Sequence, residues 1–302
     1  MRLSIIIPVY NVERYINRCA TSLFELRGLD IEYIFVNDCT PDGSMEVLRN
    51  VIDKYPEKKS QIKIINHEEN KGVANARLTG IKAAAGEYLW FVDSDDWVES
   101  YCIEKCYAAL QEDPDFILFD YYLEESEGTK YCKVDEFSVS SVLINRITPS
   151  LWKYIIKKSV LISNNIFPLS GADFAEDFLM TSCMALVSGK HIVIHEGLYH
   201  YNCQNTASYM NNITLTSLED ASKSVVRAYD FYKSNHAAKT YRIALAYMLC
   251  KRYMELQKKD KDNLSLSDLE ERIRDTETLL GLCVTRLPVM SDFAMRCYRR
   301  FA

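Results

Sequence analysis

The chain has 302 residues, of which 48% are hydrophobic and 26% charged, and its formal net charge at pH 7 is −6. This composition is ordinary for a soluble globular protein with a sizeable core. The acidic balance argues against broad nucleic-acid binding, which requires a basic face, so we expect no nucleic-acid partner.

The first 120 residues alternate apolar runs of strand length with segments of helical spacing. The expected strands cover residues 3–7, 31–36, 62–65 and 87–92, and the expected helices cover 12–23, 45–52 and 73–85. This alternation predicts an α/β fold in which a mostly parallel sheet is flanked by helices on both faces. Polar residues follow each strand, so they collect on the rim of the sheet where ligands bind in open α/β folds.

The pattern changes after residue 96. We expect a helix at 102–110, a strand at 116–122, irregular chain at 124–150, helices at 151–161 and 172–187, an extended segment at 191–201, and helices at 218–232, 237–256 and 266–280. We therefore predict an α/β domain over residues 1–215, followed by a helical C-terminal region over 216–302.

Ten cysteines are scattered along the chain without a Cys-x-x-Cys pair. This pattern favours buried free thiols in a reducing compartment over disulfides or a zinc site, and we expect a cytoplasmic protein. The first apolar run, Leu3 to Ile7, is too short for a signal peptide and is interrupted by Pro8, so we interpret it as a strand. No apolar stretch approaches the length of a transmembrane helix.

Three carboxylates crowd the run Asp93-Ser94-Asp95-Asp96, directly after the apolar segment 87–92. Like charges this close raise each other's pKa unless a cation neutralises them. A Mg²⁺ or Mn²⁺ ion shared with phosphate oxygens would explain the arrangement, because such ions take one or two carboxylates and leave positions open. The alternative is a strand-to-helix turn in which Asp95 or Asp96 caps a helix.

Familiar nucleotide-binding motifs are missing from the sequence. There is no Gly-x-Gly-x-x-Gly after the first strand, no P-loop and no Gly-x-Ser-x-Gly elbow. A nucleotide bound to this sheet would therefore depend on side-chain carboxylates and a metal ion for its phosphates.

Several motifs in order resemble the family 2 glycosyltransferases of the GT-A fold. They are Ser4-Ile5-Ile6-Ile7-Pro8-Val9-Tyr10-Asn11, Val36-Asn37-Asp38-Cys39-Thr40-Pro41-Asp42-Gly43-Ser44, Asn70-Lys71-Gly72-Val73-Ala74-Asn75-Ala76-Arg77, Phe91-Val92-Asp93-Ser94-Asp95-Asp96 and, on a later helix, Glu176-Asp177. The first four cover roughly the first 100 residues, and the acidic pair resembles the one that supplies the family's catalytic base. The resemblance implies an inverting enzyme that moves a sugar from a nucleotide-sugar, with UDP as the expected nucleotide, to a hydroxyl of a glycan or lipid-linked acceptor.

The resemblance also implies that the domain over residues 1–215 is catalytic, with a donor half at about 1–100 and an acceptor half at about 97–215. It implies roles for individual residues as well. It assigns the nucleotide site to Pro8, Tyr10, Glu13, Asp38, Arg77 and Asp93. Asp95 would bind a divalent metal, Mn²⁺ or Mg²⁺, that bridges the diphosphate, and Asp177 would be the catalytic base. The candidates on the acceptor side are Asp96, Trp97 and Glu176.

Each of these residues has a simpler interpretation. Pro8 would only end a strand, and Asp38 would be a turn residue. Arg77 would lie on a helix surface, and Trp97 would be a packed aromatic at the rim. Glu176 and Asp177 would favour a helix N-terminus through the macrodipole.

Two segments depart from the family pattern. The family often has Asn-Lys after the Trp of the segment that here reads Leu151-Trp152-Lys153-Tyr154, and it often ends a Tyr-x-Tyr-Arg sequence with an Arg where this chain has Asn202. The second departure removes a cation that would help to hold a pyrophosphate. Two other functions stay open, a nucleotidyltransferase, which would require a glycine-rich loop after the first strand, and a catalytically inactive nucleotide-binding module.

The last twenty residues, 283–302, mix apolar side chains with four arginines. A basic amphipathic tail of this kind lies at an anionic membrane surface in some proteins, which would suit an enzyme that extends a lipid-linked glycan at the inner face of a membrane. The alternative is a helix that packs on the protein's own core with its arginines in solvent.

Overall fold

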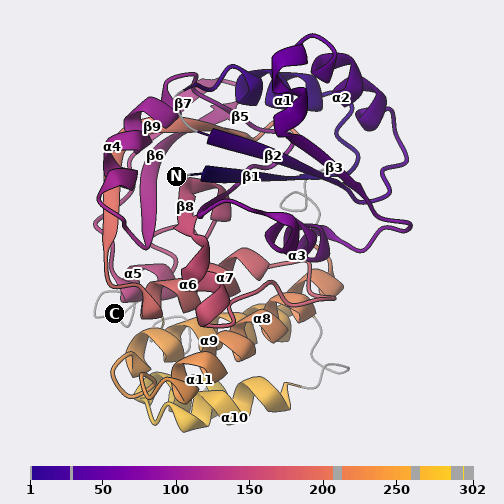
Figure 1. Ribbon diagram of the computed structural model, residues 1–302. Coiled ribbons are helices and arrows are strands. Elements are labelled where there is room, and N and C mark those ends of the chain that lie inside the picture. Colours follow the sequence, from indigo (N-terminus) through magenta and orange to yellow (C-terminus); the bar gives the residue numbers. More distant parts are fainter. Residues whose placement is uncertain (1, 28–29, 207–212, 260–265, 287–294, 296–302) are drawn as a thin grey trace. The chain divides into compact units, whose positions relative to one another are not determined.

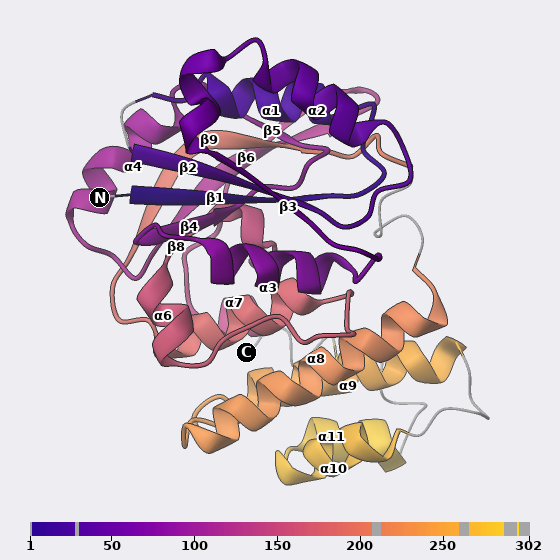
Figure 2. The ribbon, with the colours of Figure 1, turned by 45° about the vertical axis from the view of Figure 1, so that its right-hand side comes forward.

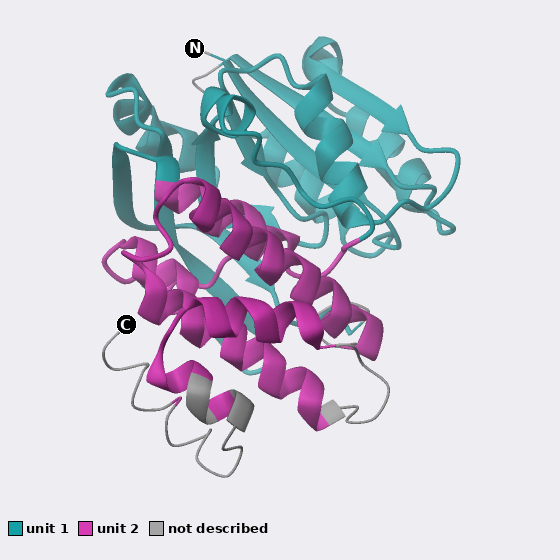
Figure 3. Cartoon of the chain, turned by 90° about the horizontal axis from the view of Figure 1, so that it is seen from below, with its two compact units in different colours: residues 1–134, 150–171, 187–208 teal, residues 135–149, 172–186, 209–302 magenta. Residues whose placement is uncertain are grey.

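A computed structural model describes residues 2–27, 30–206, 213–259, 266–286 and 295 (Figure 1). The chain divides into two compact units (Figure 3). Unit 1 comprises residues 1–134, 150–171 and 187–208, and unit 2 comprises residues 135–149, 172–186 and 209–302. The units are thus interleaved along the sequence, whereas the prediction divides the chain once, at residue 215. That the catalytic domain ends there stays a prediction.

Unit 1 is built on a nine-stranded sheet with the order β3-β2-β1-β4-β8-β6-β9-β5, in which β7 pairs with β6. The strands are β1 Arg2–Val9, β2 Asp30–Asn37, β3 Ile62–Asn66, β4 Tyr88–Phe91, β5 Trp97–Val98, β6 Phe116–Glu125, β7 Gly128–Cys132, β8 Tyr154–Lys157 and β9 His191–Asn202. The pairs from β3 to β4 are parallel, as the β-α alternation of the first 90 residues predicts. The pairs of β8 with β4 and with β6 are antiparallel, as are β5 with β9 and β7 with β6.

The helices of unit 1 cover the two faces of the sheet (Figures 1 and 2). They are α1 Ile16–Phe24, α2 Ser44–Ile52, α3 Val73–Ala83, α4 Cys102–Gln111 and α6 Lys158–Ser163. In both views α1 and α2 lie on one side of β1–β3 and α3 on the other. The predicted fold class, a sheet flanked by helices with a helical C-terminal region, is confirmed.

Alternating side chains of β1 explain why both faces are covered. Ile5 and Ile7 belong to the core cluster that includes Cys19 and Leu23 of α1. Ile6 points to the other face, where a Cβ atom on Gly80 of α3 would clash with its side chain. Only glycine therefore lets α3 approach the sheet this closely.

Two expectations for the middle of the chain are wrong. Residues 124–150 are not irregular throughout, because β6 continues to Glu125 and turns back into β7. Residues 151–161 are not one helix, because Tyr154–Lys157 form β8 at the centre of the sheet. The run Tyr-Ile-Ile is buried on both sides, and apolar periodicity alone does not separate such a strand from a buried helix.

Unit 2 is helical among its described residues. Its helices are α5 Val139–Leu143, α7 Glu176–Val187, α8 Leu215–Ser234, α9 Arg242–Lys259, α10 Ser267–Asp275 and α11 Leu279–Arg286. α9 packs against α8, α10 and α11, and a capping box formed by Thr214 and Ser217 opens α8. In the described part of the chain, no helix has both the length and the apolarity to cross a bilayer. Most of the basic tail lies outside the described residues, so its membrane contact stays a prediction.

Candidate functional site

The ends of four parallel strands meet at one rim of the unit 1 sheet. Val9 pairs with Asn37, and Asn37 pairs with Asn66. The backbone continues this register beyond the strands, because the Asp38 amide donates to the carbonyl of Val9 at 3.1 Å and the Val92 amide to that of Ile6 at 3.0 Å. The segments that begin at Pro8, Asp38 and Asp93 therefore leave the same edge of the sheet, as predicted.

The loop after β1 is tied to the loop after β2. The amide of Asn11 donates to Thr40 Oγ1 at 2.8 Å, and the amide of Glu13 donates to Asp42 Oδ2 at 2.9 Å. The Glu13 carboxylate in turn accepts from the Gly43 amide at 3.1 Å. Glu13 thus holds the two loops together, and its assignment to the nucleotide site stays a prediction. Beside it Tyr10 is 44% exposed, so its ring is open to a ligand.

Asp38 is a buried residue that hydrogen-bonds the segment between β3 and α3. Its carboxylate is 3% exposed and accepts from the amides of Lys71 at 2.9 Å and Gly72 at 2.8 Å, and it lies 2.7 Å from His67 Nδ1. Gly72 has φ +84°, a conformation that favours glycine, and α3 begins directly after it. Asp38 therefore fixes the start of α3, and its predicted contact with a nucleobase would add to these internal bonds.

Arg77 and Asp93 form an ion pair that joins α3 to the acidic turn. Arg77 Nη2 lies 2.8 Å from Asp93 Oδ1, and the arginine is 3% exposed. The simpler interpretation of Arg77 as a surface residue is wrong, because this guanidinium is buried beside the acidic run. A guanidinium group can donate two parallel hydrogen bonds, so an arginine at this place also suits phosphate oxygens.

Asp96 faces the interior of unit 1. It is 1% exposed, and its two carboxylate oxygens accept from the Tyr199 hydroxyl at 2.6 Å and from the Asn202 amide at 2.7 Å. Burial, with the charges of Asp95 and Asp93, raises the pKa of Asp96 well above its usual range. The expectation that Asp96 contacts an acceptor does not fit this geometry, because β9 already satisfies its carboxylate.

Asp95 is the carboxylate of the turn that best fits a metal ion. Its Oδ2 accepts from Asn205 Nδ2 at 2.8 Å. Burial and the neighbouring charge of Asp93 raise the pKa of Asp95 to about 6. A bound cation would stabilise the charged form of this carboxylate. Carboxylate oxygens suit Mg²⁺ and Mn²⁺. In the part of the chain that the structure describes, no three His, Cys, Asp or Glu residues form a metal-binding group.

Trp97 is packed instead of open. The Arg18 guanidinium carbon lies 3.0 Å from the centroid of the Trp97 ring, and the His200 ring is stacked on Trp97 at a centroid distance of 5.0 Å. A sugar-stacking role for Trp97 would require Arg18 or His200 to move, and it stays a prediction.

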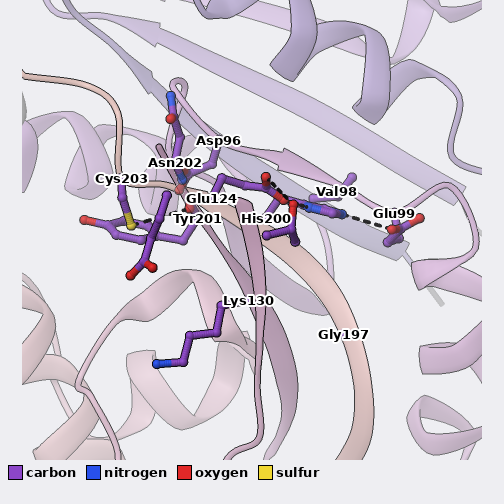
Figure 4. A network of polar contacts seen from close by, with 12 residues as sticks. Asp96, Val98, Glu99, Glu124, Lys130, Gly197, His200, Tyr201, Asn202 and Cys203 are labelled. Carbon is purple, nitrogen blue, oxygen red and sulfur yellow. Dashed lines mark hydrogen bonds and ion pairs between the residues drawn. The ribbon is translucent and has the colours of Figure 1, made fainter. Parts of the chain in front are cut away.

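His200 is the centre of a polar network at this edge (Figure 4). Its Nδ1 lies 2.7 Å from Glu124 Oε1 and its Nε2 lies 2.9 Å from Glu99 Oε1. The ring is also stacked on Tyr122 at 4.7 Å. The network links β5, β6 and β9 and so fixes the strand from which Tyr199 and Asn202 project.

Glu176 and Asp177 open α7 in unit 2. Glu176 is 6% exposed, and the Asp177 carbonyl accepts from the Thr181 hydroxyl at 2.7 Å. The residue before this pair, Ala175, has φ +65°, which costs a non-glycine residue about 1 kcal/mol. Such strain is concentrated at functional sites in proteins. The approach of Asp177 to the acidic turn of unit 1 stays a prediction.

Tyr199 and Asn205 are the site residues that sequence reasoning missed. The Tyr199 hydroxyl also accepts from the Asp93 amide at 3.1 Å, so it bridges both ends of the acidic turn. Its ring is stacked on Trp152 at 4.6 Å. The Tyr-x-Tyr sequence marked this region, but it suggested a role in binding the pyrophosphate. No sequence signal marked Asn205.

Comparison with known proteins gives the family. Residues 4–169 match Glycosyl transferase family 2. The chain belongs to this family. Over 213 residues it is 32% identical to a protein described as uncharacterized glycosyltransferase EpsJ of Bacillus subtilis (strain 168), which covers 66% of this chain and 60% of that protein. It is also 30% identical over 217 residues to glycosyltransferase GlyG of Streptococcus pneumoniae serotype 4, covering 66% and 70% of the two chains. The alignment thus spans less than two thirds of the length of EpsJ.

Several solved protein structures share the fold of this chain. The Staphylococcus aureus TarS fragment 1-349 in complex with UDP-GlcNAc aligns with a TM-score of 0.75 at 20% identity, covering 99% of this chain and 91% of that chain. The mannosyltransferase PcManGT of Pyrobaculum calidifontis, in complex with GDP-Man and Mn²⁺, aligns with a TM-score of 0.58 at 15% identity, covering 98% and 84%. At these identities the likeness establishes the fold alone.

Proposed function

We propose that this family 2 member is an inverting glycosyltransferase that moves a sugar from a UDP-linked donor to a hydroxyl of a glycan or lipid-linked acceptor. The observation that carries the proposal is the position of the Asp95 carboxylate. It lies at the rim where the strands of a parallel sheet end, crowded by Asp93 and held in place by β9 and the segment after it. A carboxylate so placed is suited to a cation that is shared with a diphosphate.

The donor would lie along the rim. Tyr10 supplies an exposed ring for the base and ribose, and Pro8 and Asp38 border the same loop. Asp93 and Arg77 would face the ribose and phosphates as an ion pair. The similar TarS structures contain UDP and UDP-GlcNAc, which supports UDP as the nucleotide.

Asp95 would hold a divalent ion, Mn²⁺ or Mg²⁺, with Asp93 near its water shell. When bound, the ion stabilises the negative charge that the diphosphate gains as it leaves. The similar PcManGT structure contains Mn²⁺, which supports the choice of metal. Asn202 does not replace the missing arginine, because its side-chain amide donates to the Asp95 carbonyl at 3.2 Å.

The chemistry is a single displacement. The acceptor oxygen forms a bond to the anomeric carbon, the bond from that carbon to the diphosphate oxygen breaks, and its electron pair goes to the nucleoside diphosphate. The proton of the acceptor hydroxyl goes to the Asp177 carboxylate as general base. One displacement without an enzyme nucleophile inverts the anomeric configuration, in contrast to the double displacement of retaining enzymes.

The test is UDP release from a panel of UDP-sugars in the presence of Mn²⁺, followed by NMR of the released or transferred sugar. We expect turnover of one donor and a product of inverted configuration. UDP binding without turnover of any donor would instead indicate an inactive nucleotide-binding module, and a product of retained configuration would contradict the single displacement.

A further inference from the structure

We infer that Asn205 is a positioning residue for Asp95, which orients the carboxylate so that one oxygen faces the divalent cation and thereby sets the affinity for that cation. The inference rests on the proposed function. It assigns a role to a residue after β9 that none of the sequence motifs includes.

The contact itself is direct and buried. Asn205 is 7% exposed, and its Nδ2 donates to Asp95 Oδ2 at 2.8 Å. The last residue of β9 contacts the backbone of Asp95, since Asn202 Nδ2 donates to its carbonyl at 3.2 Å. Asp95 is therefore held at its carbonyl by the end of β9 and at its carboxylate by the segment that follows.

The chemistry of the donor distinguishes positioning from neutralisation. A lysine or arginine at this place would pair with the carboxylate and cancel the charge that attracts a cation. An amide donates a hydrogen bond without carrying a charge, so it fixes the rotation of the carboxylate and leaves its charge in place. With Oδ2 engaged by Asn205, Oδ1 would be the oxygen that coordinates the ion.

Orientation has a large effect here because the protein contributes few ligands. Asp95 is the side chain that the proposed function assigns to the ion, so the affinity for the ion would depend strongly on the geometry of this carboxylate. Residues that hydrogen-bond a metal ligand change metal affinity by about 10–100-fold when they are mutated.

A competing account is that Asn205 only fastens the segment after β9 to the turn. The two accounts differ in what they predict for metal binding. Fastening predicts a loss of stability with unchanged affinity for the ion, whereas positioning predicts a loss of affinity in a folded protein.

The experiment measures Mn²⁺ binding directly, by EPR detection of free Mn²⁺ during titration of the full chain with saturating UDP. Asn205→Leu removes the donor, and Asn205→Gln restores a donor on a longer side chain. Asn164→Leu is the matched control, because Asn164 Nδ2 donates to the Val160 carbonyl at 2.9 Å in the same unit, away from the acidic turn. Thermal melts without metal show which variants fold, and Asn205→Ser replaces Asn205→Leu if the latter does not fold.

We expect the Kd for Mn²⁺ to rise about tenfold or more in Asn205→Leu, to recover in part in Asn205→Gln and to stay unchanged in Asn164→Leu. A folded Asn205→Leu variant that binds Mn²⁺ as tightly as the wild type, or more tightly, would overturn the inference. The wild-type titration tests the proposed function separately, because a wild-type protein that binds UDP but no Mn²⁺ would overturn the metal assignment and the inference with it.

Discussion

The Tyr199 hydroxyl donates a hydrogen bond of 2.6 Å to the carboxylate of Asp96 and accepts one of 3.1 Å from the amide of Asp93. One phenol oxygen on β9 thus closes a turn that the sequence places 103 residues away from it. β9 therefore helps to hold the acidic turn in its conformation.

Tyr199→Phe tests this bridge. The substitution keeps the stack on Trp152 but leaves the buried Asp96 carboxyl group without one of its partners, and an unsatisfied buried polar group costs about 1–3 kcal/mol. We expect the free energy of unfolding in urea to fall by about 2 kcal/mol. Tyr107→Phe, at a ring that is 46% exposed, is the control and should change it little. Equal effects of the two substitutions would contradict the bridging role.

Asp38→Ala tests whether the start of α3 depends on this carboxylate. The change removes the acceptor of the Lys71 amide and the partner of His67 Nδ1, while the Gly72 amide keeps the side-chain oxygen of Asn70 as an acceptor. We expect a loss of stability of about 2 kcal/mol in the absence of nucleotide. Asp53→Ala removes an exposed carboxylate that pairs with Lys59 at 2.7 Å, and such surface pairs contribute about 0–1 kcal/mol. If Asp38→Ala costs no more than this control, Asp38 serves only the ligand.

Asp177→Asn tests the assignment of the base. Loss of a general base lowers the rate of a proton-coupled step by about 10²–10⁴-fold. We therefore expect sugar transfer to fall by this factor while the Kd for UDP stays near the wild-type value, because Asp177 would contact the acceptor hydroxyl and not the nucleotide. Asp268→Asn, at an exposed position of α10, should leave both quantities unchanged. Transfer that persists in Asp177→Asn would assign the proton to another group.

The His200 network predicts a pH dependence of stability. Burial raises the pKa of Glu124, but hydrogen bonds from His200 and Thr129 lower it by more, so its net pKa lies below the usual value of 4.5. A carboxylate with a depressed pKa in the folded state stabilises the protein above its unfolded pKa, and this contribution is lost as the pH falls through the folded value. We expect Glu124→Gln to destabilise the protein at pH 7 and to approach the wild type as the pH falls below 4.5.

Urea unfolding at a series of pH values measures this difference. Glu127→Gln, at an exposed position on the same hairpin, is the control and should track the wild type throughout. A difference between Glu124→Gln and the wild type that stays constant below pH 4.5 would show that the carboxylate charge does not carry the effect.

The parallel half of the fold could be predicted because its signals are local. β-branched runs such as Ile5 to Ile7 alternate with amphipathic segments, and each strand ends in polar residues, so the shared rim follows from the direction of the strands. The family motifs lie in the same region, which is why Asp95 and Arg77 were identified from the sequence.

The antiparallel half and the support of the acidic turn could not be predicted, because they depend on pairings between distant segments. The apolar residues of Tyr154–Lys157 fit a buried turn of helix as well as a strand. The segment is a strand because it pairs with β4 on one side and β6 on the other. Asn205 is one asparagine in a polar segment, and its role follows from a contact with Asp95 across 110 positions. The sequence leaves open whether Trp97 is a platform for an acceptor sugar or a packed aromatic at the rim, and in the structure Arg18 and His200 pack on its ring.

The central claim is that Asp95 holds a divalent ion that a nucleotide-sugar shares. The most direct measurement is the thermal stability of the wild type and Asp95→Asn with UDP, UDP-sugars and GDP-sugars, each with Mn²⁺ and with EDTA. A ligand at 100 times its Kd stabilises the folded state by about 2.7 kcal/mol, which is readily seen as a rise in Tm. We predict that UDP-sugars raise the Tm of the wild type in Mn²⁺, that EDTA removes most of the rise, and that Asp95→Asn shows little rise in either condition. Equal rises in Mn²⁺ and EDTA, or in the wild type and Asp95→Asn, would contradict the claim.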